Sequence, residues 1–351
     1  MTDRAIRPTE TKRQATMKDV ARAAGVAQST VSRILNDAPL KIPVSDETRT
    51  RVRLAAAELG YRPHPFARAL RGAPTMLIGA IVRDITDIFF STAIEALSTE
   101  ARRRGYSVVL GHAAQRADEA LALTAVLEAR HCDGIILLGD FTDEPRLIDD
   151  LHDAATSAVA VWHGSKLEGF PNISVDNVRG TDAVLDHLTD LGHRRIAFVG
   201  GEESLGDIRE RQDAYERHLA AIGVSVPARY VQHVQNTPAG GQQAFESLFD
   251  EPKPPTAIVA ATDVLAIGIT FAAYAKGLSI PDDLSVAGFD DIPLAASAYP
   301  GLTTVRMPVG EMVSAAVDLA VGGPADAGGE SEIRMFEPRL IVRRSTGPLR
   351  S

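Results

Sequence analysis

The sequence predicts an N-terminal all-α helix-turn-helix domain followed by a two-lobed α/β core, in which each lobe is built on a doubly wound parallel sheet. Two observations predict this division. The 351 residues carry a net charge of −9, but residues 1–73 hold 14 Lys and Arg against 7 Asp and Glu, whereas residues 74–351 hold 23 against 39. The hydrophobic pattern also changes, from short helical repeats to apolar strands that alternate with amphipathic helices. A basic head on an acidic body is typical of a nucleic-acid-binding module joined to a second domain.

The first two helices of the head are predicted by their end signals. Thr16 and Asp19 form a capping-box-like pair ahead of an apolar repeat, and Gly25 is a typical helix stop. A short turn then leads to a second helix over residues 29–36. Two short helices joined by a tight turn make a helix-turn-helix, whose second helix enters the major groove of DNA at its first turn. The small polar and basic side chains expected there are Gln28, Ser29, Thr30 and Arg33.

A third helix is predicted between Ser45, its N-cap, and Gly60, just past its end. Its apolar positions should close a three-helix core; they are Val52, Ala55, Ala56 and Leu59. Three arginines, at positions 49, 51 and 53, are expected on its exterior, either near DNA or as an ordinary solvated face. The helix-turn-helix domain is therefore expected to span residues 17–60, after a disordered basic tail over residues 1–16.

Residues 61–75 are predicted to form a hinge helix and linker. Pro63 and Pro65 impose an extended entry, and residues 66–71 are too short for a helix that is stable alone, since roughly 12–15 residues are needed for marginal helicity in water. The segment should therefore fold only against a partner.

From residue 76 onward the chain alternates buried strands with helices. Four strands precede residue 163 and four follow residue 194; they are Leu77–Val82, Ser107–Leu110, Gly134–Leu138, Ala158–Trp162, Arg195–Val199, Tyr230–Val234, Ala257–Ala260 and Leu284–Ala287. Helices are expected near residues 91–104, 118–130, 144–153, 180–191, 209–222, 239–249 and 263–276. Two such runs predict two doubly wound lobes, and ligands bind such sheets at the carboxyl ends of the strands. A ligand site is therefore expected between the lobes.

Several separated motifs resemble the LacI/GalR family of bacterial transcription regulators. They include Met17-Lys18-Asp19-Val20-Ala21, Leu191-Gly192-His193-Arg194-Arg195, Ile280-Pro281-Asp282-Asp283-Leu284 and Asp290-Asp291, and the resemblance runs from Met17 to Thr346. It implies a core similar to a periplasmic sugar-binding protein. We expect an N-lobe of residues 76–175 plus about 305–332, and a C-lobe of residues 176–304 plus about 333–346.

The resemblance implies contacts to DNA from both the head and the hinge. The residues expected to make them are Lys18, Gln28, Ser29, Thr30, Arg33, Asn36, His64, Ala67 and Leu70. The position of Leu70 matches a hinge leucine that enters the minor groove beside the hinge of a second subunit. An apolar wedge of this kind costs a few kcal/mol of unstacking and bends the duplex onto more protein.

The resemblance also identifies effector-binding positions in the cleft. Arg211 and Asp290 match the family's arginine and aspartate, and they can donate to and accept from the hydroxyls of one sugar. Phe90 and Trp162, expected at strand ends, could stack on an apolar sugar face; Asn236 and Asp263 are weaker candidates. The alternatives are a cap or turn role for Asp263 and Asp290, and core packing for the two aromatic residues.

Other features of the sequence exclude several classes. Cys132 is the only cysteine, so the chain can form neither an internal disulfide nor a cysteine-based zinc cluster. No apolar run reaches the 18–20 residues or so of a membrane span, and the N-terminus lacks the apolar stretch of a signal peptide. We therefore expect a cytoplasmic protein without a metal, a cofactor or a membrane partner.

These expectations favour a repressor that binds a pseudo-palindromic double-stranded operator as a homodimer and responds to a small molecule, expected to be a sugar. One alternative is a sugar-binding protein without a DNA role, but the basic head argues against it. The other is a sugar enzyme with a Rossmann fold, but the chain has no GxGxxG after the first strand of the core, no GxxxxGK[ST] and no GxSxG. No catalytic residues are expected.

Overall fold

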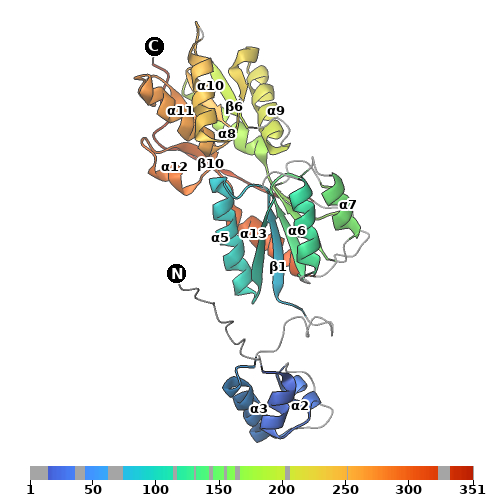
Figure 1. The fold of residues 1–351 in the computed structure, drawn as a ribbon. Helices are drawn as coiled ribbons and strands as arrows, with labels where there is room; N and C mark the ends of the chain where they lie inside the picture. The colour runs from blue at the N-terminus through green and yellow to red at the C-terminus, as the bar shows by residue number, and fades with distance from the viewer. Residues whose placement is uncertain are drawn as a thin grey trace, which may run out of the picture. The chain divides into compact units, whose positions relative to one another are not determined.

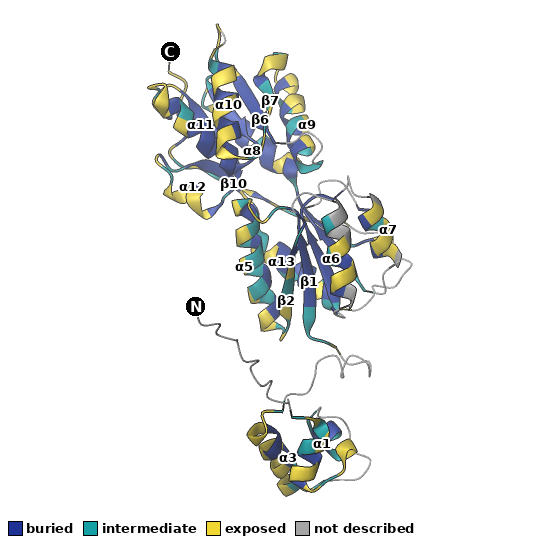
Figure 2. Ribbon diagram, viewed as in Figure 1, coloured by how far each residue is buried: buried dark blue, intermediate teal, exposed yellow. Residues whose placement is uncertain are grey.

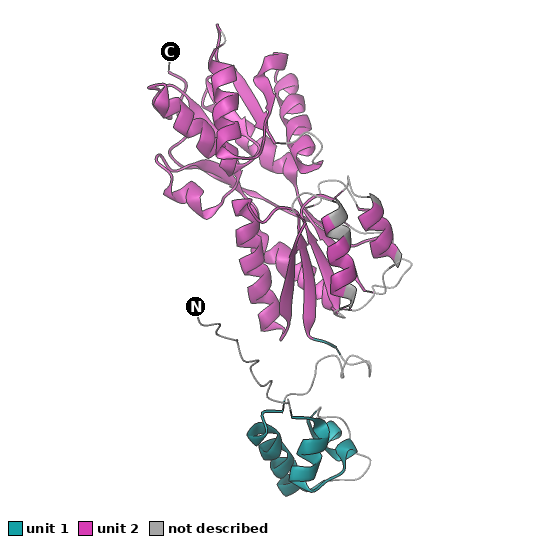
Figure 3. Cartoon of the chain, in the orientation of Figure 1, with its two compact units in different colours: residues 1–75 teal, residues 76–351 magenta. Residues whose placement is uncertain are grey.

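The computed structural model describes residues 15–35, 44–61, 74–113, 117–129, 132–141, 145–153, 156–162, 167–201, 206–250, 252–322 and 333–350. The chain divides into two compact units, residues 1–75 and residues 76–351 (Figure 3). Residues 1–14 of the expected basic tail and residues 62–73 of the expected hinge helix and linker lie outside the described residues.

The first unit contains α1 (Met17–Ala24), α2 (Gln28–Leu35) and α3 (Asp46–Glu58). The capping box predicted at the start of α1 is present: the Thr16 amide donates to Asp19 Oδ2 at 2.9 Å, and the Asp19 amide donates to Thr16 Oγ1 at 3.4 Å. Gly25 ends α1 with a φ of 64°, a conformation that a residue without a Cβ adopts readily. Ser45 caps α3 as predicted, through a hydrogen bond from the Thr48 amide.

The three helices enclose a small apolar core that holds the turn between α1 and α2 in place. Its buried members are Val20, Ala21, Ala24, Val31, Ile34, Val52, Ala55 and Ala56. Leu59 was expected among them but is 41% exposed, because it follows the last helical residue of α3 and turns away; Tyr61 packs against the core instead. Arg51 is not a free surface charge, since its Nε donates to the Ala24 carbonyl at 2.9 Å and ties α3 to the end of α1.

The second unit begins with an N-lobe built on a six-stranded sheet (Figure 1). Its elements are β1 (Leu77–Val82), α5 (Ile88–Arg103), β2 (Ser107–His112), α6 (Ala117–Ala129), β3 (Gly134–Leu138), α7 (Pro145–Asp153), β4 (Ala158–Val161), β5 (Asn172–Val175), α13 (Val309–Val321) and β11 (Ile333–Phe336). Helices α5 and α13 pack together on one face of the sheet, and α6 and α7 pack together on the other. Side chains from both faces of β1, β3 and β4 are therefore buried (Figure 2).

The C-lobe repeats this plan. Its elements are α8 (Asn177–Asp190), β6 (Ile196–Gly200), α9 (Gly206–Ala221), η1 (Ala228–Tyr230), β7 (Val231–His233), α10 (Pro238–Phe249), β8 (Ala257–Ala260), α11 (Asp263–Ala275), β9 (Ser285–Asp290), α12 (Pro293–Ser297), β10 (Thr303–Arg306) and β12 (Arg339–Ile341). Helices α8 and α9 pack against each other, as do α10 and α11. The two doubly wound lobes predicted from the sequence are confirmed.

The chain crosses between the lobes three times, after β5, after β10 and between β11 and β12. Strand β10 pairs in parallel with β9 in the C-lobe, and β11 pairs in parallel with β5 in the N-lobe. The second and third crossings thus follow residues 306 and 336, later than the expected positions near 305 and 332. Strands β5, β10, β11 and β12 are too short and too mixed in composition to stand out in the sequence.

The order of the strands determines where each sheet can bind a ligand. The N-lobe sheet runs β11-β5-β4-β3-β1-β2 and the C-lobe sheet runs β12-β10-β9-β8-β6-β7, so each contains the order 2-1-3-4-5 of a doubly wound fold. In such a sheet, successive strands are added on one side of the first strand and then on its other side, so the strand order reverses there. A crevice opens at the carboxyl ends of the two strands that flank this reversal. Here these pairs are β1 with β3 and β6 with β8.

The close approach of α10 and α11 gives a test of packing in the C-lobe. A Cβ added at Gly268 of α11 would lie 2.0 Å from the Pro238 carbonyl oxygen, and backbone cannot move aside cheaply. We expect Gly268→Ala to destabilise the core by about 1–3 kcal/mol, the usual cost of overpacking. The measurement is urea unfolding of the full chain. Gly310→Ala is the matched control, because it lies in α13 with no atom within 4 Å of the added Cβ, and should not lower stability.

Candidate functional site

A cavity of about 390 Å³ lies where the carboxyl ends of the two sheets face each other. On the N-lobe side it is lined by residues that follow β1, β3 and β4, including Asp84, Asp140 and Trp162. On the C-lobe side, Asn236 follows β7 and Asp290 ends β9. The crevice predicted from strand order is therefore a real cavity shared by both lobes.

Arg211, on α9, is the most constrained charged group of the cleft. Its side chain is 4% exposed. Its Nε donates to Asn177 Oδ1 at 2.8 Å and its Nη1 donates to the Ala261 carbonyl at 2.5 Å. The guanidinium carbon lies 3.7 Å from the centre of the Phe289 ring, which adds a cation–π contact. Packing and hydrogen bonds thus fix the guanidinium at the C-lobe wall.

Two carboxylates flank this guanidinium. Asp207 Oδ2 lies 3.5 Å from Arg211 Nη2, and Asp290 Oδ1 lies 3.8 Å from Arg211 Nη1. Burial raises the pKa of both carboxyl groups, and the neighbouring Arg211 opposes that rise. Asp290 also has a φ of 114°, a strained backbone conformation for a residue with a Cβ. Asp290 is the last residue of β9, and this position holds its carboxylate beside Arg211.

Two hydrogen bonds connect the lobes across the cleft. Asn236 Nδ2 donates to Asp87 Oδ2 at 2.9 Å, and the Gly206 amide donates to Asp140 Oδ2 at 2.7 Å. The Thr262 hydroxyl donates to Asn236 Oδ1 at 2.6 Å, which orients the Asn236 amide toward Asp87. Burial raises the pKa of Asp87, whose other oxygen caps α5. These bonds join the two lobes directly.

The aromatic side of the cleft comes from the N-lobe. Trp162 follows β4 with a φ of 59°, and Phe89 packs edge-on against it with ring centres 5.0 Å apart. Among the described residues, the buried Trp162 Nε1 has no hydrogen-bond partner. Phe90 lines the cavity, but from the first turn of α5 and not from a strand end as expected.

Asp263 does not line the cavity. It is fully buried at the start of α11, where its Oδ2 accepts from the Ile292 amide at 2.9 Å and its Oδ1 accepts from the Thr304 hydroxyl at 2.5 Å. These bonds hold the segment after β9, and β10 beside it, in place behind Asp290. The cap or turn role, which was the alternative for Asp263, therefore describes this residue better than a ligand contact does.

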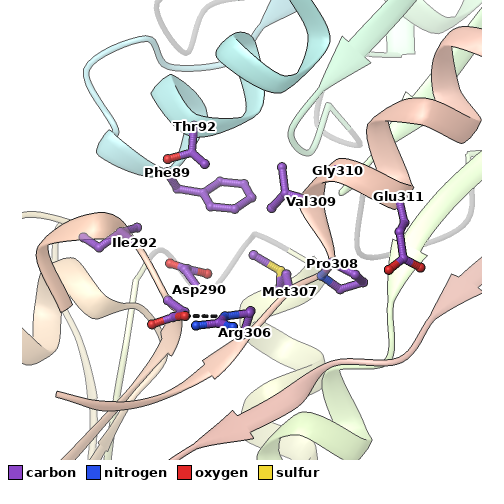
Figure 4. Close-up of a pocket in the computed structure, with 11 residues that line it drawn as sticks. Phe89, Thr92, Asp290, Ile292, Arg306, Met307, Pro308, Val309, Gly310 and Glu311 are labelled. Carbon is purple, nitrogen blue, oxygen red and sulfur yellow. Dashed lines mark hydrogen bonds and ion pairs between the residues drawn. The ribbon is translucent and has the colours of Figure 1, made fainter. Parts of the chain in front are cut away.

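A second cavity of about 320 Å³ adjoins the first (Figure 4). It lies between the first turns of α5 and the segment that leads from β10 into α13, and it shares Phe89, Asp290 and Met307 with the main cleft. Arg306 and Arg343 both contact Asp291 at its edge, at 2.5 and 2.7 Å. The carboxylate of Asp290 thus lies beside the crossing segments that connect the lobes.

Sequence reasoning missed four acidic residues that line the main cleft: Asp84, Asp87, Asp140 and Asp207. A signal for two of them was present, because Asp84 and Asp140 closely follow the apolar strands β1 and β3, whose carboxyl ends flank the reversal of strand order. Asp87 and Asp207 belong to the starts of α5 and α9, where an acidic residue is also an ordinary helix-capping choice.

In the head, the described residues that are expected to contact DNA lie on α1 and α2. Lys18, Gln28 and Ser29 are exposed, and Thr30 and Arg33 are half-buried. Gln28 and Ser29 begin α2, and Ala27 before them has no side-chain oxygen to cap the helix. Backbone amides in the first turn of such a helix suit a phosphate. Asn36, His64, Ala67 and Leu70 lie outside the described residues.

Known proteins resemble this chain in both sequence and structure. The pattern of bacterial regulatory proteins of the lacI family matches residues 16–64, and that of the periplasmic binding protein-like domain matches residues 185–346. The HTH-type transcriptional repressor CytR of Escherichia coli K12 is 34% identical over 335 residues, which is 95% of this chain and 97% of CytR. The chain belongs to the lacI family of bacterial regulatory proteins. It is a DNA-binding transcriptional regulator, as the sequence predicted.

Two solved structures of the lacI family extend the comparison. The lac repressor dimer bound to operator and an anti-inducer superposes with a TM-score of 0.84 at 26% identity, covering 95% of this chain and all of the repressor chain. A lacI-family regulator from Enterococcus faecium with bound ribose gives a TM-score of 0.69 at 26% identity, covering 78% of this chain and all of that one. Within the described part of this chain, no helix is long and apolar enough to cross a membrane.

The buried Asp263 gives a prediction for pH. Burial raises its pKa to about 7 from an ordinary 3.8, so the folded state holds a proton that the unfolded state releases. The stability that this proton contributes is fully present below pH ~4 and is lost as the pH rises through ~7. Between pH 5 and 8, wild type should lose about 2 kcal/mol more stability than Asp263→Asn, as measured by urea unfolding.

The control for this measurement is Asp213→Asn, because Asp213 is exposed on α9. Its pH profile should follow that of wild type. Parallel profiles for wild type and Asp263→Asn would show that the buried carboxyl group does not take up a proton in the folded state.

Proposed function

We propose that this lacI-family protein is a cytoplasmic, non-enzymatic repressor whose affinity for a pseudo-palindromic operator is set by a sugar or sugar derivative bound between the core lobes. The observation that carries the proposal is the interlobe cavity itself, in which a fixed guanidinium and several carboxylates meet the aromatic side chains of Phe90 and Trp162. Donors, acceptors and an apolar face together match a polyhydroxylated ring. The regulator from Enterococcus faecium with bound ribose supports this ligand class.

The ligand would act through the contacts between the lobes. Asp87 and Asp140 of the N-lobe accept hydrogen bonds from Asn236 and Gly206 of the C-lobe. A ligand that enters between these groups changes the free energy of the closed arrangement relative to an open one. It can shift operator affinity only by the difference between its affinities for the two states, and DNA must shift ligand affinity by the same factor.

Operator recognition would use two copies of the head. In a homodimer, the first turns of the two α2 helices enter successive major grooves, with Gln28, Ser29 and Thr30 at base edges or phosphates and Lys18, Arg33 and Asn36 nearby. His64, Ala67 and Leu70 of the two hinges then contact the minor groove at the operator centre, where Leu70 acts as the wedge. The lac repressor dimer bound to operator supports this arrangement.

A gel shift with DNA from the chain's own promoter region tests the DNA part of the proposal. Gln28→Ala should weaken specific binding about tenfold or more, because one base-edge contact supplies about 1–3 kcal/mol, and should change binding to random DNA little. Thr50→Ala is the control, since Thr50 is exposed on α3 with its hydroxyl bonded to its own helix. Absence of any specific complex for wild type at both 50 and 200 mM salt would contradict the regulator assignment.

The ligand part is tested on the operator complex with a panel of neutral sugars. A sugar that shifts operator affinity in wild type should lose that effect in Asp290→Ala, because the carboxylate that accepts its hydroxyl hydrogen bond is gone. Asp213→Asn, on the exposed face of α9, should respond as wild type does. An undiminished response in Asp290→Ala would remove this residue from the ligand site.

A further inference from the structure

The charged groups that line the main cleft are strongly unbalanced. Among its described lining residues, five carry a carboxyl group: Asp84, Asp87, Asp140, Asp207 and Asp290. Only two carry a positive charge, Arg83 and Arg211. The carboxyl groups come from both lobes, so they surround the cavity instead of forming one wall.

Both guanidinium groups are already engaged by the protein. Arg211 donates hydrogen bonds to Asn177 and to the Ala261 carbonyl, and it forms ion pairs with Asp207 and Asp290. Arg83 is buried at the end of β1 and donates to the Asp140 carbonyl. Neither group presents a free fork to a ligand, which is the arrangement that bidentate binding of a phosphate requires.

The carboxyl groups crowd one another. Burial is the largest cause that raises the pKa of Asp87 and of Asp290. The charges of Asp84 and Asp207 raise the pKa of Asp87 further, and the charges of Asp263, Asp87 and Asp207 raise that of Asp290. Asp87 meets amide donors at both oxygens, from Phe89 and Asn236, and it contacts no cation among the residues that the structure describes. An anionic ligand placed among these carboxylates would be repelled by them, and it would find no additional cation to pair with.

We propose that this cleft rejects anionic ligands and that the effector is uncharged, so that a sugar would bind and its phosphate ester would not. This inference rests on the proposed function and narrows its ligand class. The same groups suit a neutral polyol well, because carboxylate oxygens accept hydrogen bonds from hydroxyl groups. Specificity would thus come from repulsion as well as from hydrogen bonds.

The carboxylate best suited to a test is Asp207. It lies at the start of α9 and is one of the two carboxylates beside Arg211. Asp207→Asn keeps the shape of the side chain, removes one negative charge from the cleft and frees part of the Arg211 guanidinium. Asp213→Asn is a matched control, because it makes the same charge change on the exposed face of the same helix.

The experiment titrates the full-length wild type, Asp207→Asn and Asp213→Asn with inorganic phosphate and with ribose 5-phosphate, by calorimetry at constant ionic strength. We expect no saturable binding below ~10 mM for wild type and Asp213→Asn, and at least about tenfold tighter binding of both probes by Asp207→Asn. Saturable wild-type binding that Arg211→Gln abolishes would overturn the proposal. Equal affinities in the Asp207→Asn and Asp213→Asn variants would overturn it too.

These outcomes are distinguishable from a failure of the proposed function. A protein that forms a specific operator complex released or tightened by ribose 5-phosphate is a repressor with an anionic effector, and only the charge inference fails. A protein that forms no specific complex fails as a repressor, whatever its affinity for phosphate.

Discussion

The buried guanidinium of Arg211 is the constraint around which the cleft is organised. A cation that is almost completely removed from water must be compensated, and the compensation comes from four different elements: Asn177 on α8, the carbonyl after β8, Asp207 on α9 and Asp290 at the end of β9. The need to satisfy one charge therefore fixes the relative positions of the loops that form the C-lobe wall.

The order of the strands explains why the N-lobe faces this C-lobe wall of the cleft. In each sheet the reversal of strand order opens a crevice at the carboxyl edge, and the three crossings bring the two edges face to face. The hydrogen bonds from Asn236 to Asp87 and from Gly206 to Asp140 span the same gap. A ligand that binds there cannot avoid changing the contacts between lobes, and this coupling is what a ligand-controlled regulator of the lacI family needs.

Much of the fold followed from local signals. The capping box at Thr16, the left-handed Gly25 and the Ser45 cap are decided by hydrogen bonds within one turn of the chain, so the sequence alone located them. The main strands were also visible, since both faces are buried and the strands read as apolar runs. The short strands β5, β10, β11 and β12 were not visible, because pairing with distant neighbours and not composition makes them strands.

By itself, the sequence determined the division into a basic helix-turn-helix head and an acidic two-lobed core, and its resemblance to the LacI/GalR family led us to expect Arg211, Asp290, Asn236 and Trp162 in a cleft between the lobes. Only the tertiary structure decided which acidic residues line that cleft. Asp263 and Asp290 look alike in the sequence, yet one turns inward to bond Ile292 and Thr304 and the other faces the cavity. The reason is physical: the direction of a side chain depends on partners that are far away in the chain and near only after folding.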